Sequence, residues 1–401
     1  MKIVHTSDWH LGHSFYGYER SEEHLCFLKQ LCNIVRSEAP DALIISGDIY
    51  HSVAPTIAAQ KLYNRMMLEL RATAPAMKII ITAGNHDSSS RLELNGELWN
   101  AFNVKIVGNI ERNEDCVNYD KHIICIENSD NKTIGYVLAV PYVYHANYPA
   151  IESDTESRMH YFHQQLLTRV AESNKDKLPV IMMGHLAVSG ANIRGHETKY
   201  THLVYENIEE LGEGYDYLAL GHIHHPQTVK GCNRARYSGS PIPLSFDEDY
   251  PHSVSIVEIE KHDDLPTIRE VTIEPPVPIY TIPVEKEGIE AILEEIDSLP
   301  KGKSYVRVKL KVKDVIPMSE RAIIEERFSG LEAILCEIQP VRETVPAVEQ
   351  SAFAPEEIKQ ISPIDIAKDY YCRRFGEEMS KDLQQLLQES IDAVNNLGKE
   401  D

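Results

Sequence analysis

Short runs of Ile, Val and other apolar residues recur through the first two thirds of the chain and constrain its fold more than any other feature. Each run has the length of one strand and ends near Gly, Asp, Asn or Pro. Helical patterns separate them; between residues 57 and 70, Leu62, Met66 and Leu70 share one helical face. This alternation predicts an α/β domain with helices outside the sheets. We expect strands at 2–6, 42–46, 78–82, 104–107, 123–126, 133–140, 180–184, 217–220 and 253–259, enough for more than one sheet.

Proline residues mark the end of this region. The passage Pro275-Pro276-Val277-Pro278 predicts a linker, so the first domain covers residues 1–274. Between 279 and 342 the patterns run strand, helix, strand, helix, strand, which predicts a small α+β domain. Residues 343–361 have no clear period and predict a tether. Residues 362–397 carry an apolar stripe at helical spacing, which predicts a helical tail that needs a surface to pack against.

Composition narrows the class of protein. No apolar run approaches 18 residues and the N-terminus does not resemble a signal peptide, so we expect no membrane span. The 7 cysteines include no CxxC pair, which favours a reduced, cytoplasmic protein. With 40 Lys+Arg against 62 Asp+Glu, the formal net charge is −22. Taken alone, this acid excess argues against nucleic acid as a partner, because phosphate binding usually leaves a basic footprint.

Side chains that bind metals follow five of the predicted strands. They are Asp8, His10, Asp48, Asn85, His185, His222 and His224. Because open α/β sheets collect their sites at the carboxyl ends of strands, we expect these side chains to meet. Oxygen and nitrogen ligands without sulfur favour Mn²⁺, Mg²⁺, Fe or Zn²⁺, with Mn²⁺ well suited to the mixed set. One shared carboxylate would allow two ions about 3.5–4 Å apart, as in two-metal hydrolases. Each motif alone is commonplace, but all five in order are not.

Longer strings extend this pattern. They are HTSDWHLG at 5–12, SGDIYHS at 46–52, AGNHDS at 83–88, LGHIHHPQ at 220–227 and YSGSPIPLSFDE at 237–248. The pattern resembles the calcineurin-like metallophosphoesterase superfamily across residues 1–260. Over nearly the whole chain it is similar to the SbcD family, the nuclease subunits of SbcCD complexes. The resemblance implies a sandwich of two β-sheets flanked by helices, a small α+β capping domain and a C-terminal helical tail.

The resemblance also implies a role for each site residue. One ion would bind Asp8, His10, Asp48 and His224, and the second Asp48, Asn85, His185 and His222. His86 matches the family's catalytic histidine, and His51 matches a second active-site histidine. The alternative interpretation of His51 is a loop histidine at a turn, without a catalytic role. Asp87 is expected to orient His86. No ATP site is expected on this chain, because Asp297 stands where a P-loop needs its first Gly. The resemblance implies that ATP binds a separate SbcC-like subunit.

The expected function is a metal-dependent DNA nuclease, a double-strand exonuclease and single-strand or hairpin endonuclease in DNA end processing, repair, recombination and replication. Expected partners are DNA, an SMC-family ATPase of the SbcC type bound through the C-terminal helices, and a second copy in a homodimer within a heterotetramer. Two alternatives stay open: another phosphatase or phosphodiesterase of the superfamily, and a non-catalytic scaffold with the same fold.

Two surfaces have competing interpretations. Arg307, Lys309, Lys311 and Lys313 share one face of the strand predicted at 304–313, and this face either contacts DNA phosphates or is simply solvated. The apolar residues of the helices after the GD and GNHD motifs either fill the core or form the homodimer contact. These residues are Leu62, Met66, Leu70, Leu92, Leu98, Trp99 and Phe102.

Overall fold

A computed structural model describes residues 1–113, 116–151, 157–195, 204–284, 287–312 and 315–342, together with residues 364, 368, 371, 379–381 and 383–388. The chain forms two compact units, Met1–Val341 and Arg342–Asp401. Among the described residues, no helix has the length and apolar composition needed to cross a bilayer.

The first large sheet contains the strands that precede the first three metal-ligand motifs. Its order is β18 (Thr267–Thr272), β17 (Ser253–Glu258), β1 (Lys2–Thr6), β4 (Ala42–Ser46), β5 (Lys78–Thr82) and β6 (Val104–Val107). Strands β1, β4, β5 and β6 are parallel, whereas β17 and β18 are antiparallel to their neighbours. The intervening helices are α1 (Ser21–Glu38), α2 (Ile57–Thr73), α3 (Ser89–Glu93) and α4 (Gly96–Asn100).

The second large sheet contains the strands that precede the last two motifs. Its order is β15 (Gln227–Thr228), β16 (Ala235–Tyr237), β14 (Tyr217–Gly221), β11 (Val180–His185), β10 (Thr133–Ala139) and β9 (Ile123–Glu127). Strands β10, β11, β14 and β16 are parallel. Helix α5 (Arg158–Ser173) follows β10. Shorter elements are β2 (Ser14–Phe15), β3 (Tyr18–Glu19), β7 (Arg112–Asn113), β8 (Cys116–Val117), β12 (Ala187–Val188), β13 (Tyr205–Glu206) and the 3₁₀ turns η1 (Tyr119–His122), η2 (His145–Asn147) and η3 (Ile208–Leu211).

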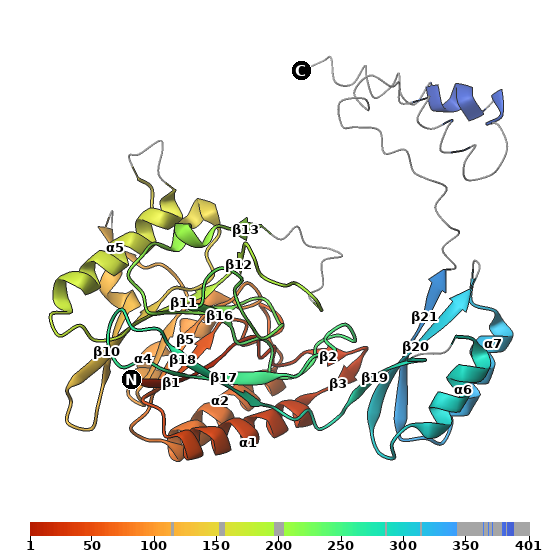
Figure 1. The fold of residues 1–401 in the computed structure, drawn as a ribbon, viewed down its shortest axis with the longest axis horizontal. Coiled ribbons are helices and arrows are strands. Elements are labelled where there is room, and N and C mark those ends of the chain that lie inside the picture. Colours follow the sequence, from red (N-terminus) through yellow and green to blue (C-terminus); the bar gives the residue numbers. More distant parts are fainter. Residues whose placement is uncertain are drawn as a thin grey trace. The chain divides into compact units, whose positions relative to one another are not determined.

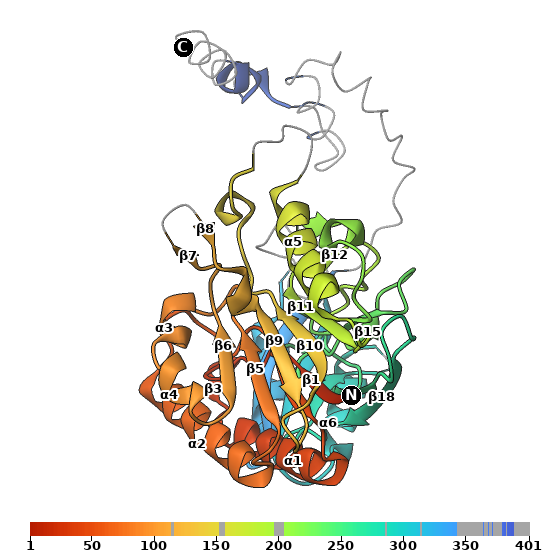
Figure 2. The same cartoon turned by 90° about the vertical axis from the view of Figure 1, so that its left-hand side faces the viewer.

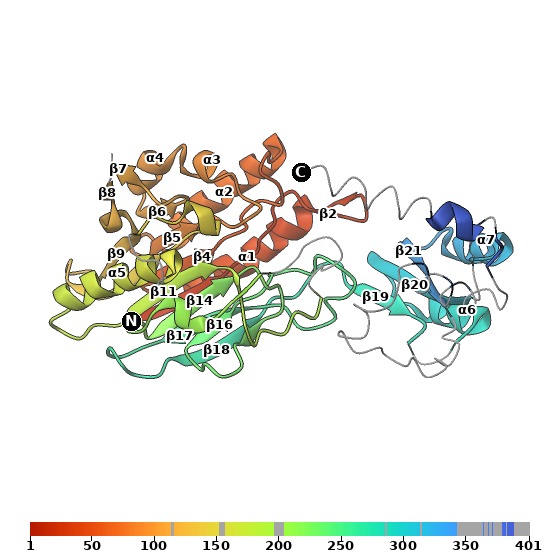
Figure 3. The same ribbon diagram turned by 90° about the horizontal axis from the view of Figure 1, so that it is seen from above.

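The two sheets face each other across one apolar layer and carry their helices outside. Ile44 and Ile80 of the first sheet pack against Ile181 of the second. The outer face of the first sheet packs on α1 and α2, and that of the second packs on α5. Figures 2 and 3 show α1 to α4 grouped together and α5 apart from them, beside β11. Strands covered on both faces are apolar throughout, which is why the sequence shows continuous runs. The predicted two-sheet sandwich is confirmed.

A smaller three-stranded sheet follows the proline-rich linker. Its order is β19 (Ile279–Ile282), β20 (Ser304–Val312) and β21 (Ala333–Arg342), and α6 (Ile289–Ser298) and α7 (Met318–Phe328) connect its strands. Both helices cover the same face of this sheet (Figure 1). Ile292 and Ile296 of α6 and Ile324 of α7 are buried there against Val306 and Val308. The elements occur in the predicted order, although the small sheet and the two large ones belong to one compact unit.

Strand β20 joins the small sheet to the first domain. Tyr305 is fully buried beside Phe15, and its hydroxyl donates to Glu23 Oε1 at 2.8 Å. Arg307 is only 5% exposed, and its Nη2 lies 2.9 Å from Asp247 Oδ1. The expectation that Arg307 belongs to an open basic face is therefore wrong, because a loop of the first domain covers it.

The other members of the predicted basic face differ from Arg307. Lys309 and Lys311 are exposed, and Lys311 Nζ lies 2.6 Å from Glu287 Oε2. Lys313 lies outside the described residues, as do the tether at 343–361 and most of the predicted tail. Within the tail, the described residues include helical positions from Leu383 to Gln388, where Leu386 is exposed.

Candidate metal centre

Five loops that follow parallel strands meet at one edge of the sandwich. Strands β1, β4 and β5 of the first sheet lead into the loops of Asp8, Asp48 and Asn85. In the second sheet, β11 ends at His185 and β14 leads into the loop of His222. Because both sheets present the carboxyl ends of parallel strands at this edge, side chains far apart in sequence converge. The structure brings together all seven predicted metal-ligand residues.

The backbone at this edge adopts conformations that non-glycine residues rarely take. The φ angles are +53° at Asp8, +44° at His10, +52° at Asp48 and +96° at His222. Positive φ costs free energy in residues with a Cβ atom and is concentrated at functional sites. A Cβ atom at Gly84 would collide with the carboxylate of Asp48. The loops are thus held in turns that direct side chains toward one another.

Asp48 lies at the centre of the cluster. Its Oδ2 is 3.4 Å from Nε2 of His10 and 3.4 Å from Nε2 of His185. Burial alone would raise the pKa of Asp48, but the neighbouring His185 holds it well below its usual range. An ionised carboxylate between two imidazoles from opposite sheets has the position expected of a ligand shared by two cations.

One group of ligand atoms surrounds Asp8, on the side of Asp48 where His10 lies. Ligand atoms of Asp8, His10 and His224 lie within 4.8 Å of one another. His10 Nε2 is buried and makes no hydrogen bond to any residue that the structure describes. Burial also lowers the pKa of His10 well below its usual value, so its imidazole is neutral. A neutral, buried imidazole nitrogen without a hydrogen-bond partner among these residues fits a metal ligand.

A second group surrounds Asn85. Asn85 Oδ1 is 3.0 Å from Nε2 of His185 and 3.0 Å from Nδ1 of His222. His185 Nδ1 lies 2.8 Å from the carbonyl of Ser46, to which it must donate because a carbonyl only accepts. This second hydrogen bond fixes the orientation of the ring and leaves Nε2 for a cation. Separations near 3 Å suit neighbouring ligands around an ion bound at about 2.1 Å. The residues therefore fit two divalent cations.

Without a cation, protons would neutralise this centre. The carboxylate of Asp48 raises the pKa of His185 to about 9, although burial acts in the opposite direction. Burial raises the pKa of Asp8. A divalent cation would replace the proton on His185, because a metal ligand must be deprotonated.

Sequence reasoning assigned no role to Glu248. Its Oε1 lies 3.0 Å from Nδ1 of His224, and its Oε2 accepts from Ser240 Oγ at 3.0 Å. Burial would raise the pKa of Glu248, but His224 lowers it, so the carboxylate is ionised and Nδ1 donates to it. Because Nδ1 donates to Glu248, His224 would bind a cation through Nε2. The only sequence signal was the string SFDE at 245–248, which follows no strand.

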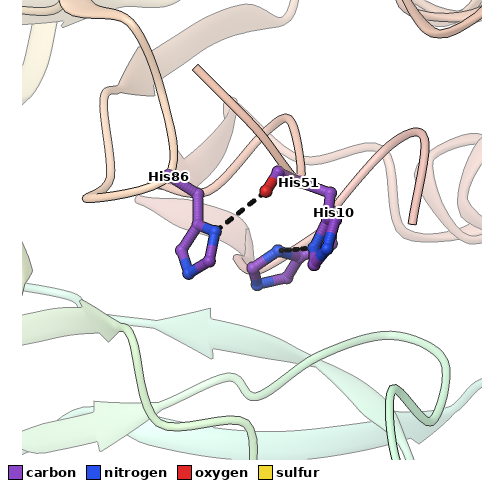
Figure 4. Close-up of side chains that lie close together, drawn as sticks. All are labelled: His10, His51 and His86. Carbon is purple, nitrogen blue, oxygen red and sulfur yellow. Dashed lines mark hydrogen bonds between the residues drawn. The ribbon is translucent and has the colours of Figure 1, made fainter. Parts of the chain in front are cut away.

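His51 and His86 stand beside the ligands. His86 Nδ1 lies 2.9 Å from the carbonyl of His51, to which it donates, and the His51 ring lies 3.4 Å from His10, nitrogen to nitrogen (Figure 4). The rings of His51 and His86 stack with centroids 5.6 Å apart. The amide of His86 also donates to Asp48 Oδ1 at 2.9 Å. Both predicted catalytic histidines are therefore tied to the ligand cluster.

Asp87 has different contacts from those expected. Its carboxylate accepts hydrogen bonds from the amides of Gly84, Ile49 and Tyr50, at 2.9 to 3.1 Å, and among the described residues it makes none to the imidazole of His86. Burial and the nearby Asp48 raise the pKa of Asp87 to about 7. Asp87 therefore joins the loops after β4 and β5, and any orienting effect on His86 would act through the backbone of these loops.

A hollow of about 590 Å³ opens beside the ligands. Its lining includes His10, Asp48, Asn85, His185, His222 and His224. Residues 140–145 and Tyr148 also line it, with Tyr142, Tyr144 and His145 among them. Burial and the neighbouring Tyr144 raise the pKa of Tyr142 to about 12, so its hydroxyl stays neutral. Sequence reasoning missed this aromatic segment, which follows β10 without any metal-ligand motif.

Comparison with known proteins agrees with this geometry. The model of the calcineurin-like phosphoesterase family matches residues 1–226. The SbcD component of the SbcCD nuclease of Rhodobacter capsulatus is 30% identical over 75% of this chain and 76% of its own length. The corresponding proteins from Escherichia coli K12 and Bacillus subtilis are 26% and 28% identical over 97% and 95% of this chain, in each case over 96% of their own length. This chain belongs to the SbcD family of calcineurin-like phosphoesterases.

Membership of the SbcD family gives the site its chemical class. An SbcD protein is a metal-dependent nuclease subunit, an enzyme that hydrolyses phosphodiesters. The candidate catalytic centre of this SbcD chain is the cluster around Asp48, where its parallel strands collect carboxylate, amide and imidazole groups.

Proposed function

We propose that this chain cleaves DNA, as a double-strand exonuclease and a single-strand or hairpin endonuclease, in a complex with an SbcC-type ATPase. The observation that carries the proposal is a shared carboxylate, Asp48, with ligand sets on both sides and a hollow in front of them. Such a cluster suits a phosphodiester, whose negative charge must be neutralised before a nucleophile can approach. We assign the protein to the cytoplasm and to DNA end processing, repair, recombination and replication.

Each of two cations has a proposed ligand set. Asp8, His10, Asp48 and His224 would hold the first, and Asp48, Asn85, His185 and His222 the second. Mn²⁺ suits this mixture of carboxylate, amide and imidazole better than softer metals. Bound cations would neutralise phosphate charge and make a strong nucleophile available near neutral pH.

The histidines supply the proton chemistry. His86 Nδ1 donates to the carbonyl of His51, so Nε2 is the atom at which His86 would hold a proton for the leaving oxygen. His51 stacks on His86 and would fix the ring plane. Asp87 contributes by joining the loops that carry Asp48 and His86, not by touching the reacting atoms.

The direct experiment supplies the purified chain with Mn²⁺ and four substrates. These are a linear duplex, a hairpin, a single-stranded oligonucleotide and 4-nitrophenyl phosphate. We expect Mn²⁺-dependent cleavage of DNA that EDTA abolishes, with the monoester a poor substrate. Preferential hydrolysis of the monoester would indicate a phosphatase. If the chain turned over none of the substrates, it would be a non-catalytic scaffold. The His160→Gln variant, which changes a histidine of α5 outside the cluster, is the matched control.

Contacts with partners are also proposed. The homodimer would use exposed apolar side chains around α3 and α4: Leu98 is 59% exposed and Phe102 45% exposed, whereas Met66, Leu70, Leu92 and Trp99 are core residues. Leu62 also packs against that core. The helical tail at 362–397 would bind the coiled-coil region of the ATPase, a helix-in-groove interaction. We keep 1–274, 279–342, 343–361 and 362–397 as the proposed domain boundaries.

DNA contacts are proposed for Lys309 and Lys311 of β20 and for Lys313, which lies outside the described residues, but not for Arg307. Lys309 and Lys311 are exposed on one face of the strand. If they contact phosphates, replacing both with Gln reduces the slope of DNA affinity against salt concentration by about 2. An unchanged slope would leave this face as a solvated surface.

A further inference from the structure

Two aromatic side chains line the hollow that contains the metal ligands, the half-buried Tyr142 and the exposed Tyr144. We propose that Tyr142 and Tyr144 form a stacking site for an unpaired nucleobase beside the scissile phosphodiester. The proposal rests on the proposed action on DNA and adds a substrate contact and a preference: the site would favour a nucleotide whose base is not already paired and stacked in a duplex.

Tyr142 is fixed to the catalytic loops. Its amide donates to the carbonyl of Ala83 at 2.8 Å, immediately before the loop that carries Asn85 and His86. Its ring lies edge-on to the imidazole of His185, with centroids 6.3 Å apart. The aromatic wall is thus held by the same backbone that positions the ligands, so its distance from the reacting atoms is set by the fold.

Tyr144 extends this wall into solvent. It is 64% exposed, and its ring packs edge-to-face on Tyr142 with centroids 5.1 Å apart and an angle of 79° between the rings. In this edge-to-face contact the two rings touch at an edge, so most of the Tyr144 side chain stays exposed to solvent. Tyr144 is an exposed aromatic side chain that lies next to a second ring at the rim of the hollow. Exposed apolar groups clustered beside a pocket indicate a binding surface.

The two tyrosines also separate two hollows. Both line the 590 Å³ hollow that contains the ligands, and both line an adjoining hollow of about 500 Å³. The second hollow has polar walls that include Asn109 and Arg112. A nucleotide with its phosphate at the ligands would place its base at the ridge between the hollows, and the chain beyond it could continue past the guanidinium of Arg112.

The chemistry of the wall fits a base better than other groups. Tyr142 and Tyr144 offer π-faces and hydroxyl groups, so they would recognise a flat aromatic group without reading its sequence. Stacking on aromatic side chains is the usual way in which proteins hold unpaired bases without sequence preference. A base inside a duplex is already stacked, and taking it out costs a few kcal/mol.

The test compares Tyr144→Ala and Tyr144→Phe with wild type on two single-stranded oligonucleotides. One carries normal bases, and the other carries tetrahydrofuran abasic residues throughout its cleaved region. On the normal substrate we expect Tyr144→Ala to lose about 5- to 150-fold in kcat/KM, the range of one stacked base, and Tyr144→Phe to stay within about twofold. On the abasic substrate we expect wild type and Tyr144→Ala to be equal.

The outcomes are distinguishable. If Tyr144→Ala loses equally on both substrates, or loses nothing on either, the stacking site is overturned. If wild type cleaves neither oligonucleotide, the proposed function fails with it. Calorimetric titration with Mn²⁺ shows whether each variant retains its metal centre, and Tyr144→Leu, which keeps an apolar side chain without a ring, should behave like Tyr144→Ala. Tyr161→Ala, on α5 and outside both hollows, is the matched control.

Discussion

Glu248 is the residue whose contribution is easiest to separate from that of the ligands themselves. It hydrogen-bonds His224 from 24 positions further along the chain and touches no other candidate ligand in the described contacts. A carboxylate behind an imidazole fixes the ring orientation and makes the opposite nitrogen a stronger ligand.

Glu248→Gln tests this contact. The amide keeps the shape but loses the charge that holds the Nδ1 proton, so we expect Mn²⁺ affinity to fall about 10- to 100-fold. Isothermal titration calorimetry measures it, with Glu213→Gln on the surface as the control. Unchanged affinity would mean that the His224 ring needs no carboxylate behind it.

His86→Gln separates catalysis from metal binding. His86 contacts the carbonyl of His51 and the carboxylate of Asp48, and in its proposed role it supplies a proton and no ligand atom. We expect Mn²⁺ affinity to be retained and the rate of DNA cleavage to fall by about 10²- to 10⁴-fold. Normal turnover would remove His86 from the mechanism, whereas loss of Mn²⁺ would make it a ligand.

At the level of single residues, the sequence predicts the metal ligands better than it predicts the residues that hold those ligands in position. Each metal-ligand residue directly follows or ends a recognisable strand, so the topology of the sheets brings them together. Glu248 follows no strand, and the carboxylate of Asp87 binds backbone amides, whose positions no local pattern reveals. The proposed role of Tyr144 could be recognised only from the structure, where its side chain is exposed beside the hollow.

Among the elements, β20 has the most varied surroundings. One face of this strand belongs to the core of the small sheet, while Tyr305 and Arg307 are buried against the first domain. The alternation of the sequence places Arg307, Lys309 and Lys311 on one face correctly, but it cannot show that a loop near Asp247 covers only the first of them. Strands buried on both faces are the easiest to predict, because their apolar runs are continuous.

Replacing Tyr305 tests the contact between the small sheet and the first domain. Tyr305→Ala removes a buried ring beside Phe15 and the hydrogen bond to Glu23, so we expect the free energy of unfolding to fall by about 3–5 kcal/mol. Tyr305→Phe, which loses only the hydrogen bond, should lose about 1 kcal/mol. Urea denaturation measures both. Equal stability of the alanine variant and wild type would contradict the packing described for β20.

For the whole molecule, the negative net charge affects how the chain would bind DNA and which proposed partners it would need. A net charge of −22 opposes DNA binding by a single chain, although two bound cations and the exposed lysines of β20 would offset it locally. The proposed homodimer would bring two such centres together, and the proposed ATPase partner would supply most of the affinity for DNA.

Leu98→Glu tests the proposed dimer surface. Leu98 is 59% exposed on α4, so a charge there costs the folded chain little but opposes burial in an interface. We expect sedimentation equilibrium to show a weaker dimer by about tenfold or more, with Mn²⁺ binding unchanged. Leu331→Glu, on the exposed surface of the small domain, is the control. A dimer of full strength would move the interface elsewhere.

Buried histidines that are not candidate metal ligands predict how the stability of the fold depends on pH. Burial lowers the pKa of both His122 and His163 to about 4. Between pH 6.5 and 4 the unfolded chain therefore binds protons that the folded chain does not, and the free energy of unfolding falls as the pH falls. At about 1.4 kcal/mol per pKa unit, each histidine accounts for up to about 3 kcal/mol.

The measurement uses EDTA-treated protein and compares wild type with His163→Asn. Urea denaturation at pH 7 and pH 4.5 should show a smaller loss of stability in the variant, by about 2 kcal/mol. Identical losses would mean that His163 is protonated without cost in the folded chain.

The convergence of ligands from both sheets has a consequence for synthesis in the cell. Asp8, Asp48 and Asn85 emerge from the ribosome early, but His222, His224 and Glu248 emerge only when the second sheet is nearly complete. A truncated product that ends before Gly221 would therefore lack ligands on both sides of Asp48. We therefore expect the chain to become able to cut nucleic acid only late in the translation of its first domain, and incomplete copies that lack these residues to be inactive.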